Sequence, residues 1–470
     1  MIPTAIQCLV FVFFSMPIIR VNSHTCQGIS QYDQCSLNSA CGCMHMPGAI
    51  NAGICGYKHL ACSGFVPCAS SNNACEPGYI CVYHPVCYTL PICYPISMAG
   101  EPFCPTITMT NSTTQPSLTT TTTTTIPTTS QSEWSLTGNM TYAGWRHTAS
   151  VLSNGIVLVT GGHNNSYPSR AELYDPSVDT WTTTGNMNNI RFSYTASVLS
   201  NGKVLVTGGW DDNTFNSAEL YDPSTGTWTT TGSMTNARWV HTASVLSNGK
   251  VLVTGGRNDN SGALNSAELY DPSTGIWTTT GNMNNVRYLH TASVLSNGKV
   301  LVTGGFGNGL LNGAELYDPS TGIWTTTGNM NNARRSHTAS VLSNGEVLVI
   351  GGHDGNNGHS NSAELYDPIT STWTTTSNMN SGRQQQTASV LSNGKVLVTG
   401  GRNDNSGALN SAELYDPPTS TWTITTNMND ARYSHTASVL SNGKVLVTGG
   451  DNGNSVALNS AELYELFGTN

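Results

Sequence analysis

Cysteine is absent from most of this sequence. All 13 cysteines of the 470 residues lie between Cys8 and Cys104, so residues 105–470 must fold without disulfides of their own. Charge is also sparse, since Asp, Glu, Lys and Arg make up 10% of the residues and the net charge is −9. A nucleic-acid-binding surface needs a basic stripe to neutralise phosphates. We therefore expect no nucleic-acid partner.

Long apolar runs are absent apart from one near the N-terminus. This run extends from Leu9 to Ile19, contains Pro17 and is too short for a transmembrane helix. Val21-Asn22-Ser23 follows it and fits a small-residue cleavage site. Residues 1–23 are therefore predicted to be a secretory signal peptide of an extracellular protein without a stable membrane anchor. The C-terminal residues 463–470 are too short and polar for a lipid-anchor signal.

Twelve cysteines follow the predicted signal peptide, within residues 24–104. An even number of cysteines in a short segment of a secreted chain predicts a disulfide-stapled domain, here with up to six disulfides. Only Cys41 and Cys43 are closely spaced, which disfavours a zinc site. The pairing is not readable from the spacing. The predicted disulfide residues are Cys26, Cys35, Cys41, Cys43, Cys55, Cys62, Cys68, Cys75, Cys81, Cys87, Cys93 and Cys104.

Residues 105–132 are rich in threonine and include seven consecutive threonines, Thr119–Thr125. In a secreted protein this composition predicts an O-glycosylated, extended linker without a core. Three N-glycosylation sequons begin at Asn111, Asn139 and Asn164.

The remaining residues, 133–470, consist of one unit repeated seven times: TASVLSNG, VLVTGG and AELYDP, followed by a tryptophan in six of the seven copies. Successive copies are separated by 47 or 49 residues. Such a period is typical of propellers and solenoids. The first threonine of each copy, which we use as an anchor, is Thr148, Thr195, Thr242, Thr291, Thr338, Thr387 or Thr436.

Each unit predicts four short strands separated by turns. In the third copy the strands are expected at 242–246, 251–254 and 267–270 and from Trp277 onwards. Asn248-Gly249 suits a tight hairpin, and the apolar residues 251–254 indicate a strand buried on both faces. Four antiparallel strands per unit make one propeller blade.

The unit resembles the kelch repeat, in which a Gly-Gly pair precedes a Tyr of the third strand and a Trp of the fourth. The first copy has Gly161-Gly162, Tyr174 and Trp181 at these positions. The resemblance implies an all-β, seven-bladed kelch-type propeller. The last copy has no tryptophan of its own, whereas Trp134 stands before the first copy. We therefore expect the N-terminal strand around Trp134 to complete the last blade and close the ring.

Two segments differ most between copies: the loop after Gly-Gly and the residues just before the first strand. Antiparallel strand directions place both on one face, where loops commonly carry recognition. The residues three before each anchor, here named the pre-strand ring, are predicted to bind ligand, together with Trp210 and Phe306 in the loops. The pre-strand ring consists of Trp145, Phe192, Trp239, Tyr288, Arg335, Gln384 and Tyr433. In peptide-binding kelch propellers, which this alignment resembles, the residue after the motif arginine faces the pocket. The alternative is that these aromatics only cap the inner strands.

Two recurring polar residues are interpreted as structural. An arginine precedes six of the pre-strand ring residues and is expected to bond neighbouring turns. A histidine precedes five of the anchors and is expected to form blade-to-blade hydrogen bonds, because seven equivalent positions around an axis do not converge to metal-bonding distance. The Asn/Asp-rich loops 257–262 and 402–407 contain one Asp each and do not match a calcium loop.

Enzyme classes with similar folds fit poorly. Secreted seven-bladed kelch propellers include the copper radical oxidases, whose cofactor contains a Tyr cross-linked to a Cys inside the propeller. No cysteine follows Cys104 in this sequence. The turn before Trp228 is similar to a sialidase Asp box, but Asp222 and Gly226 are four residues apart instead of two. We therefore expect a non-enzymatic secreted protein without cofactor that binds an extracellular protein, peptide or glycan. A structural matrix component and a propeller enzyme of unknown type remain alternatives, and the oligomeric state is open.

Overall fold

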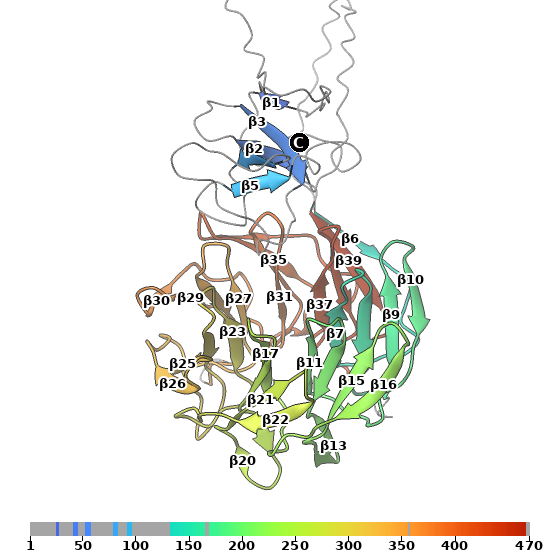
Figure 1. Cartoon of the computed structure of the whole chain (residues 1–470), viewed down its shortest axis with the longest axis vertical. Coiled ribbons are helices and arrows are strands. Elements are labelled where there is room, and N and C mark those ends of the chain that lie inside the picture. The colour runs from blue at the N-terminus through green and yellow to red at the C-terminus, as the bar shows by residue number, and fades with distance from the viewer. Residues whose placement is uncertain are drawn as a thin grey trace, which may run out of the picture. The chain divides into compact units, whose positions relative to one another are not determined.

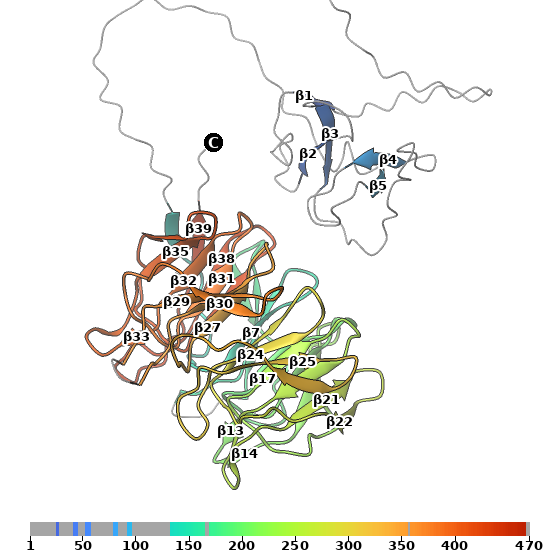
Figure 2. The same cartoon turned by 90° about the vertical axis from the view of Figure 1, so that its left-hand side faces the viewer.

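The computed structural model describes residues 132–466, apart from 165–168 and 356–357, together with five short strands nearer the N-terminus (Figures 1 and 2). The chain divides into two compact units, residues 1–124 and 125–470. In the described residues no helix is long and apolar enough to cross a membrane. The predicted signal peptide, the Thr-rich linker up to residue 131 and Asn111 lie outside the described residues.

The N-terminal unit contains two small antiparallel sheets in its described part. One has the order β1-β3-β2 and the other pairs β4 with β5. Their registers place Cys43 opposite Cys55 and Cys81 opposite Cys93. The cysteine side chains lie outside the described part, so the disulfides stay a prediction. The strands are β1 (Thr25–Gln27), β2 (Cys41–His45), β3 (Ala52–Tyr57), β4 (Tyr79–Val82) and β5 (Ile92–Pro95).

The second unit contains seven four-stranded antiparallel sheets arranged around a central axis, as the resemblance implied (Figure 1). We number these blades in chain order of their innermost strands, which surround the axis. The innermost strands of blades 1 to 7 are β7 (Thr148–Val151), β11 (Thr195–Val198), β17 (Thr242–Val245), β23 (Thr291–Val294), β27 (Thr338–Val341), β31 (Thr387–Val390) and β37 (Thr436–Val439).

Three further strands complete each blade towards its outer edge. The second strands are β8 (Val157–Thr160), β12 (Val204–Thr207), β18 (Val251–Thr254), β24 (Val300–Thr303), β28 (Val347–Ile350), β32 (Val396–Thr399) and β38 (Val445–Thr448). The third strands are β9 (Ala171–Asp175), β15 (Ala218–Asp222), β21 (Ala267–Asp271), β25 (Ala314–Asp318), β29 (Ala363–Asp367), β35 (Ala412–Asp416) and β39 (Ala461–Leu466). The outermost strands are β10 (Thr180–Thr183), β16 (Thr227–Thr231), β22 (Ile276–Thr279), β26 (Ile323–Thr326), β30 (Thr372–Thr375), β36 (Thr421–Ile424) and, in blade 7, β6 (Ser132–Leu136).

In the part of the chain that the structure describes, three of the loops after Gly-Gly form additional small hairpins. In each hairpin the residue directly after Gly-Gly opens the first strand. The hairpin strands are β13 (Trp210–Asp211) with β14 (Asn213–Thr214), β19 (Arg257–Asn258) with β20 (Gly262–Ala263), and β33 (Arg402–Asn403) with β34 (Gly407–Ala408).

The strand positions in a blade agree with the sequence pattern to within one residue. In blade 3 the innermost strand ends at Val245, the third strand extends to Asp271 and the outermost strand begins at Ile276. The turn between the first two strands is closed by the Leu246 N–H, which donates to the Lys250 carbonyl at 2.8 Å. Gly249 adopts a φ of +80°, the left-handed conformation that favours glycine.

The hydrophobic core lies between blades. Seven clusters of buried side chains each join two neighbouring blades, and every second strand is buried along its whole length. The cluster between blades 1 and 2, for example, packs Leu158 against Val204 and Tyr221. The prediction of a second strand buried on both faces is therefore confirmed.

The ring closes between residues far apart in the sequence. Strand β6 pairs antiparallel with β39, and the two lie side by side in Figure 1. Trp134 lies opposite Tyr464, with ring centroids 5.1 Å apart, and its indole N–H donates to the Thr426 carbonyl at 2.9 Å. The predicted completion of the last blade by the N-terminal strand is confirmed.

A buried ion pair fixes the loop between successive blades. In blade 2, Arg191 lies in the loop before β11 and donates to the Gly208 carbonyl and to the Glu219 carboxylate. Glu219 also accepts the backbone N–H groups of Asn188 and Asn189. We call this arrangement the Arg–Glu clamp. Six clamps have Nη2···Oε1 distances of 2.6–2.8 Å: Arg191–Glu219, Arg238–Glu268, Arg287–Glu315, Arg334–Glu364, Arg383–Glu413 and Arg432–Glu462.

The clamps confirm that the recurring arginine is structural. All six arginines are fully buried, and so are the six glutamates of the clamps. A buried charge is costly unless it is paired and hydrogen-bonded. Each clamp pairs the charge and gives both terminal nitrogens of the arginine hydrogen-bond acceptors, whereas the arginine Nε has no partner among the described residues. Because each of these arginines precedes a blade and its carboxylate lies inside that blade, the clamps hold one blade's outgoing loop against the next blade.

Deleting residues 133–140 from the full chain is expected to destabilise the propeller. The deletion removes most of β6 together with the buried Trp134, and loss of such a core aromatic alone costs about 3–5 kcal/mol. Thermal unfolding measures the effect, with deletion of Thr119–Thr125 as the control outside the propeller. A chain without residues 133–140 that melts like the intact protein would contradict closure by β6.

Candidate functional site

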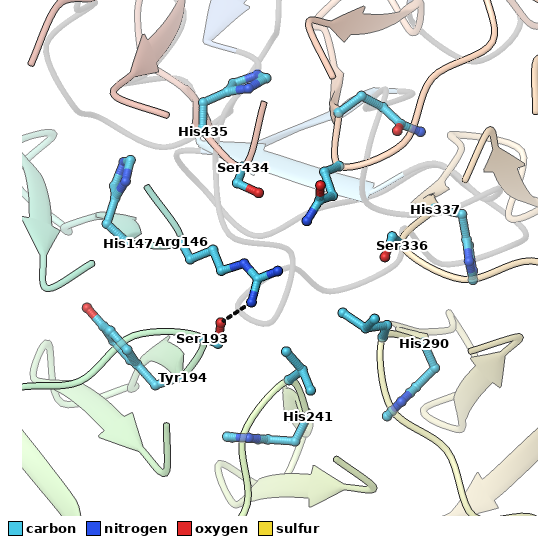
Figure 3. Close-up of a pocket in the computed structure, with 14 residues that line it drawn as sticks. Arg146, His147, Ser193, Tyr194, His241, His290, Ser336, His337, Ser434 and His435 are labelled. Atoms are coloured by element: carbon cyan, nitrogen blue, oxygen red, sulfur yellow. Dashed lines mark hydrogen bonds between the residues drawn. The ribbon is translucent and has the colours of Figure 1, made fainter. Parts of the chain in front are cut away.

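A pocket of about 300 Å³ lies on the propeller axis, at the end of the blades where the second strands terminate (Figure 3). Each blade contributes the two residues that precede its anchor threonine. The outer residue of each pair, here named a rim residue, is Arg146, Ser193, Val240, Leu289, Ser336, Gln385 or Ser434. The inner residues form a second layer: His147, Tyr194, His241, His290, His337, Gln386 and His435.

The backbone of the rim residues forms a closed ring of hydrogen bonds. Each rim N–H donates to the carbonyl of the rim residue in the preceding blade, at 2.9–3.3 Å, and Arg146 completes the ring by donating to Ser434. All seven rim residues have φ between +47° and +56°, although none is glycine. Such left-handed backbone is costly for ordinary residues and is common at binding sites. Here the ring of hydrogen bonds stabilises it.

The rim side chains give the pocket an uneven chemistry. Arg146 is the charged rim residue, and its guanidinium donates to the Ser193 hydroxyl at 3.3 Å, as Figure 3 shows. Burial lowers the pKa of Arg146, but arginine stays protonated at neutral pH. Val240 and Leu289 line the part of the rim two and three blades further on, and the pocket lining contains no carboxylate. The pocket is therefore cationic on one side and apolar on another.

The histidine layer joins neighbouring blades. His241 Nε2 lies 3.0 Å from the Thr195 hydroxyl and 3.3 Å from the Thr207 hydroxyl, both in the preceding blade. His147, His290, His337 and His435 make equivalent contacts with two threonines each. In the two other blades, the Tyr194 hydroxyl contacts Thr148 and Thr160, and Gln386 donates to the Ile350 carbonyl at 2.9 Å. The predicted blade-to-blade role is confirmed.

Burial keeps these histidines neutral. It lowers the pKa of His147 to about 4. Burial and the positive charges of Arg238 and Arg191 lower the pKa of His241 to about 3. Burial and the positive charges of Arg334 and Arg287 lower the pKa of His337 to about 3. The pKa values of His290 and His435 lie well below the usual value, mainly because of burial. The layer therefore adds no positive charge to the pocket at neutral pH.

The axial cavity continues below the histidine layer. A space of about 530 Å³ is lined there by the histidine layer, apart from Tyr194, and by the anchor threonines and the alanines that follow them. Among the described residues, no group of three or more His, Cys, Asp or Glu side chains is arranged to hold a metal ion.

Each residue of the pre-strand ring directly precedes a rim residue in the sequence and lies further from the axis. Its seven members are half-buried, apart from Phe192, which is buried, and none of them lines the pocket. Each forms an antiparallel bridge with the residue that follows Gly-Gly, so the two variable segments do lie on one face. The bridges are Trp145–His163, Phe192–Trp210, Trp239–Arg257, Tyr288–Phe306, Arg335–His353, Gln384–Arg402 and Tyr433–Asp451.

These bridges gather aromatic rings around the pocket. From blade 1 to blade 3, His163 contacts both Trp145 and Phe192, Phe192 contacts Trp210, and Trp210 approaches Trp239, with ring centroids 5.0–6.3 Å apart. On later blades aromatic rings alternate with cations: Tyr288 contacts Phe306, the Arg335 guanidinium lies 5.4 Å from the Phe306 ring, and Arg402 lies 5.3 Å from Tyr433. The predicted residues Trp210 and Phe306 thus belong to the same surface as the pre-strand ring.

Two predicted glycosylation sites fall in the described part. Asn139 is exposed and Asn164 is half-buried. Their modification stays a prediction.

The rim residues were not singled out from the sequence. Their signal is variability, because the rim position holds Arg, Ser, Val, Leu or Gln among seven otherwise similar copies. Their orientation towards the axis depends on the positive φ, which the residue types do not indicate.

The fold and the pocket define a class: seven-bladed propellers with an axial pocket walled by loops. Residues 195–393 and 240–450 match the KLHDC2/KLHL20/DRC7 Kelch-repeats domain, and residues 144–188 match the Kelch motif. The two stretches of the first match together cover residues 195–450, which is more than half of the 470 residues. The chain therefore belongs to the kelch-repeat propeller family.

Similar solved structures show the same fold at low sequence identity. A fungal alcohol oxidase of the AA5 family, in complex with copper, is 20% identical with a TM-score of 0.61, over 71% of this chain and 76% of that one. The protein YjhT is 18% identical with a TM-score of 0.50, over 62% of this chain and 99% of that one. No curated protein matches the sequence.

The histidine layer predicts loss of stability at mildly acidic pH. In the unfolded chain a histidine takes up a proton below about pH 6.5, whereas folded His147 resists protonation until about pH 4. The folded state therefore binds fewer protons in this window, and each such histidine costs about 1.4 kcal/mol per pH unit as the pH falls. Denaturant unfolding at pH 7.5, 6 and 5 measures the slope.

His241→Gln provides the control, because Gln386 already occupies the equivalent position of blade 6. This variant is expected to lose stability less steeply with falling pH than the parent protein. Equal slopes for parent and variant would contradict the assignment to the histidine layer.

Proposed function

We propose that this protein is a secreted, non-enzymatic binding protein whose loop face takes an extracellular protein, peptide or glycan that carries a carboxylate. The axial pocket receives the carboxylate, and the pre-strand ring provides the surrounding contact surface. Membership of the kelch family supports a binding role in general. The ligand class and the extracellular location go beyond that and are part of this proposal.

Arg146 is the observation that carries the proposal. It is the charged residue of the rim, and the lining residues offer no carboxylate to neutralise it. Its guanidinium contacts the Ser193 hydroxyl and lies 5.1 Å from the Trp145 ring, which leaves donors for a ligand. An arginine fork binds carboxylates with two parallel hydrogen bonds. Ser193 and Ser434, in the two blades next to that of Arg146, supply further hydrogen-bonding groups, and Val240 and Leu289 suit an apolar part of the same ligand.

The aromatic surface extends the contact area beyond the pocket. Half-buried Trp and Tyr side chains provide large, rigid contacts for peptide side chains or sugar rings. The rings from Trp145 to Trp239 contact one another, so they form a continuous surface next to Arg146. A ligand anchored in the pocket would cover this surface.

The likeness to a copper alcohol oxidase raises an enzymatic alternative, but at 20% identity it concerns the fold alone. The tyrosine–cysteine cofactor that the resemblance to copper radical oxidases implies needs a cysteine in the propeller, and residues 105–470 contain none. We therefore favour binding over catalysis.

An array of acidic and neutral peptides and glycans tests the pocket. Ligands with carboxylates are expected to be retained, and Arg146→Gln should weaken their binding about 10- to 100-fold, because hydrogen bonds to charged groups contribute about 1.5–3 kcal/mol. Ser336→Ala serves as the control on the same rim and should have little effect. Equal retention of acidic and neutral ligands, unchanged in Arg146→Gln, would refute the carboxylate proposal.

The aromatic surface is tested separately with Trp239→Ala and Tyr288→Ala. Each is expected to weaken binding of the ligands found on the array by about fivefold or more, since aromatic side chains that anchor an interface contribute about 1 kcal/mol or more. Surface plasmon resonance measures the change, and thermal unfolding confirms that the variants fold. Unchanged affinity in both variants would contradict a role in binding and indicate that the pre-strand ring only caps the inner strands.

A further inference from the structure

The junction between blade 7 and blade 1, here named the closing seam, is built differently from the other six. The loop from β6 to β7 has Gly144 where the six other loops have the arginine of the Arg–Glu clamp. In blade 1, Arg170 stands where five blades have a serine that contacts this arginine. Trp181 has no partner for its indole N–H among the described residues, whereas Trp228 donates to the Gly185 carbonyl across a seam.

The backbone of Gly144 nevertheless forms the same backbone hydrogen bonds as clamp arginines form in other loops. Its N–H donates to the Leu458 carbonyl at 3.1 Å, and its carbonyl accepts from the Gly450 N–H at 2.8 Å. A Cβ placed on Gly144 would lie 3.5 Å from the Gly161 carbonyl, an ordinary contact. Gly161 corresponds to Gly208, whose carbonyl accepts from the Arg191 guanidinium at 2.7 Å. A side chain at position 144 would therefore point towards the acceptors of a clamp.

A small cavity lies where this side chain would be. It has a volume of about 20 Å³ and is lined by Tyr142, Gly144, Gly161, Arg170 and Glu172, among others. A polar space of this size holds about one water molecule. The larger guanidinium group occupies the equivalent position in the six clamps.

Glu172 is 3% exposed and accepts the N–H groups of Thr141 and Tyr142 at 2.7 and 2.9 Å. Among the described residues it has no cation within ion-pair distance, whereas the other six clamp carboxylates each have an arginine. A desolvated carboxylate of this kind gains most from a cation that also donates hydrogen bonds.

We propose that this cavity is a binding site for a guanidinium group. The six clamps show the chemistry: a planar cation that donates to a glycine carbonyl, to the carbonyl before the third strand and to the buried carboxylate. Blade 1 keeps all three acceptors, in Gly161, Arg170 and Glu172. A planar fork with several N–H donors matches these acceptors, which a compact ammonium group does not. The site shares one lining residue, His147, with the axial pocket and is otherwise formed by other residues, and it is independent of the proposed function.

Arg170 limits the affinity of the site. Its own guanidinium lies 3.9 Å from the Tyr142 ring centroid, at the exposed side of the cavity, and does not reach Glu172. It repels a second cation, and it replaces the serine hydroxyl that serves as the fourth acceptor in blade 2. Arg170→Ser restores the serine and removes the charge.

Two sources of guanidinium fit the same chemistry: a free guanidino compound and an arginine side chain of a partner protein. Guanidinium chloride represents the first, and N-acetyl-argininamide represents the second. Both are titrated into the full chain by calorimetry at low millimolar concentration and matched ionic strength, with tetramethylammonium chloride as the reference cation. Thermal unfolding of the same samples is the second readout.

Saturable binding of one guanidinium per chain is expected. Guanidinium at about ten times its dissociation constant should raise the melting midpoint by about 2 °C. Arg170→Ser should bind about tenfold more tightly. Gly144→Arg should abolish binding and raise the midpoint on its own, because it supplies the missing clamp. Arg191→Gly should create an equivalent cavity in blade 2 and bind two guanidinium ions.

The two probes distinguish the sources. Binding of N-acetyl-argininamide as well as guanidinium identifies an arginine side chain as an acceptable ligand, whereas binding of guanidinium alone identifies a free guanidino compound. The proposal is wrong if neither probe binds more than tetramethylammonium does, or if Gly144→Arg binds guanidinium as the parent protein does.

Discussion

A buried carboxylate in the third strand of every blade is the constraint on which the propeller depends. Buried away from water, each of these glutamates needs hydrogen-bond donors, and it obtains two from backbone N–H groups of the loop that arrives from the preceding blade. In six blades a buried arginine completes the arrangement. The loop is thereby fixed to the next blade before it turns into the innermost strand. The positions of the rim and of the histidine layer follow from this attachment.

The fold could be predicted from the sequence because the same pattern of strands and turns occurs in seven copies. The alternation of apolar strands with Asn-Gly and Asp-Pro turns predicts the blades, and the position of Trp134 ahead of the first copy predicts the closure by β6. The structural roles of the arginine and the histidine were also predictable, since residues repeated in blade after blade serve what all blades share. These features belong to the single repeat unit, and the propeller contains the same feature in most of its blades.

The pocket was harder to predict because backbone conformation, and not residue type, decides which side chain faces the axis. Trp239 and Tyr288 attract attention as large aromatics, yet the neighbouring Val240 and Leu289 line the pocket. Their positive φ turns one residue inward and leaves the aromatic beside it to pair with the loop after Gly-Gly. A sequence pattern does not distinguish these two neighbours. In the same way, the absence of a clamp at Gly144 is apparent only when its loop is compared with the six loops that have an arginine at this position.

The closed ring of rim hydrogen bonds has an electrostatic consequence for any ligand on the axis. Every rim N–H points towards the preceding blade, so the seven peptide dipoles are arranged head to tail in a circle around the axis. A helix terminus, by contrast, aims its dipoles at the ligand. Dipoles that circulate around a point largely cancel there, which makes the rim backbone electrically silent at the centre of the pocket. The potential that a ligand meets is then set by the seven rim side chains, and any one of them can be exchanged without turning a backbone dipole towards the axis.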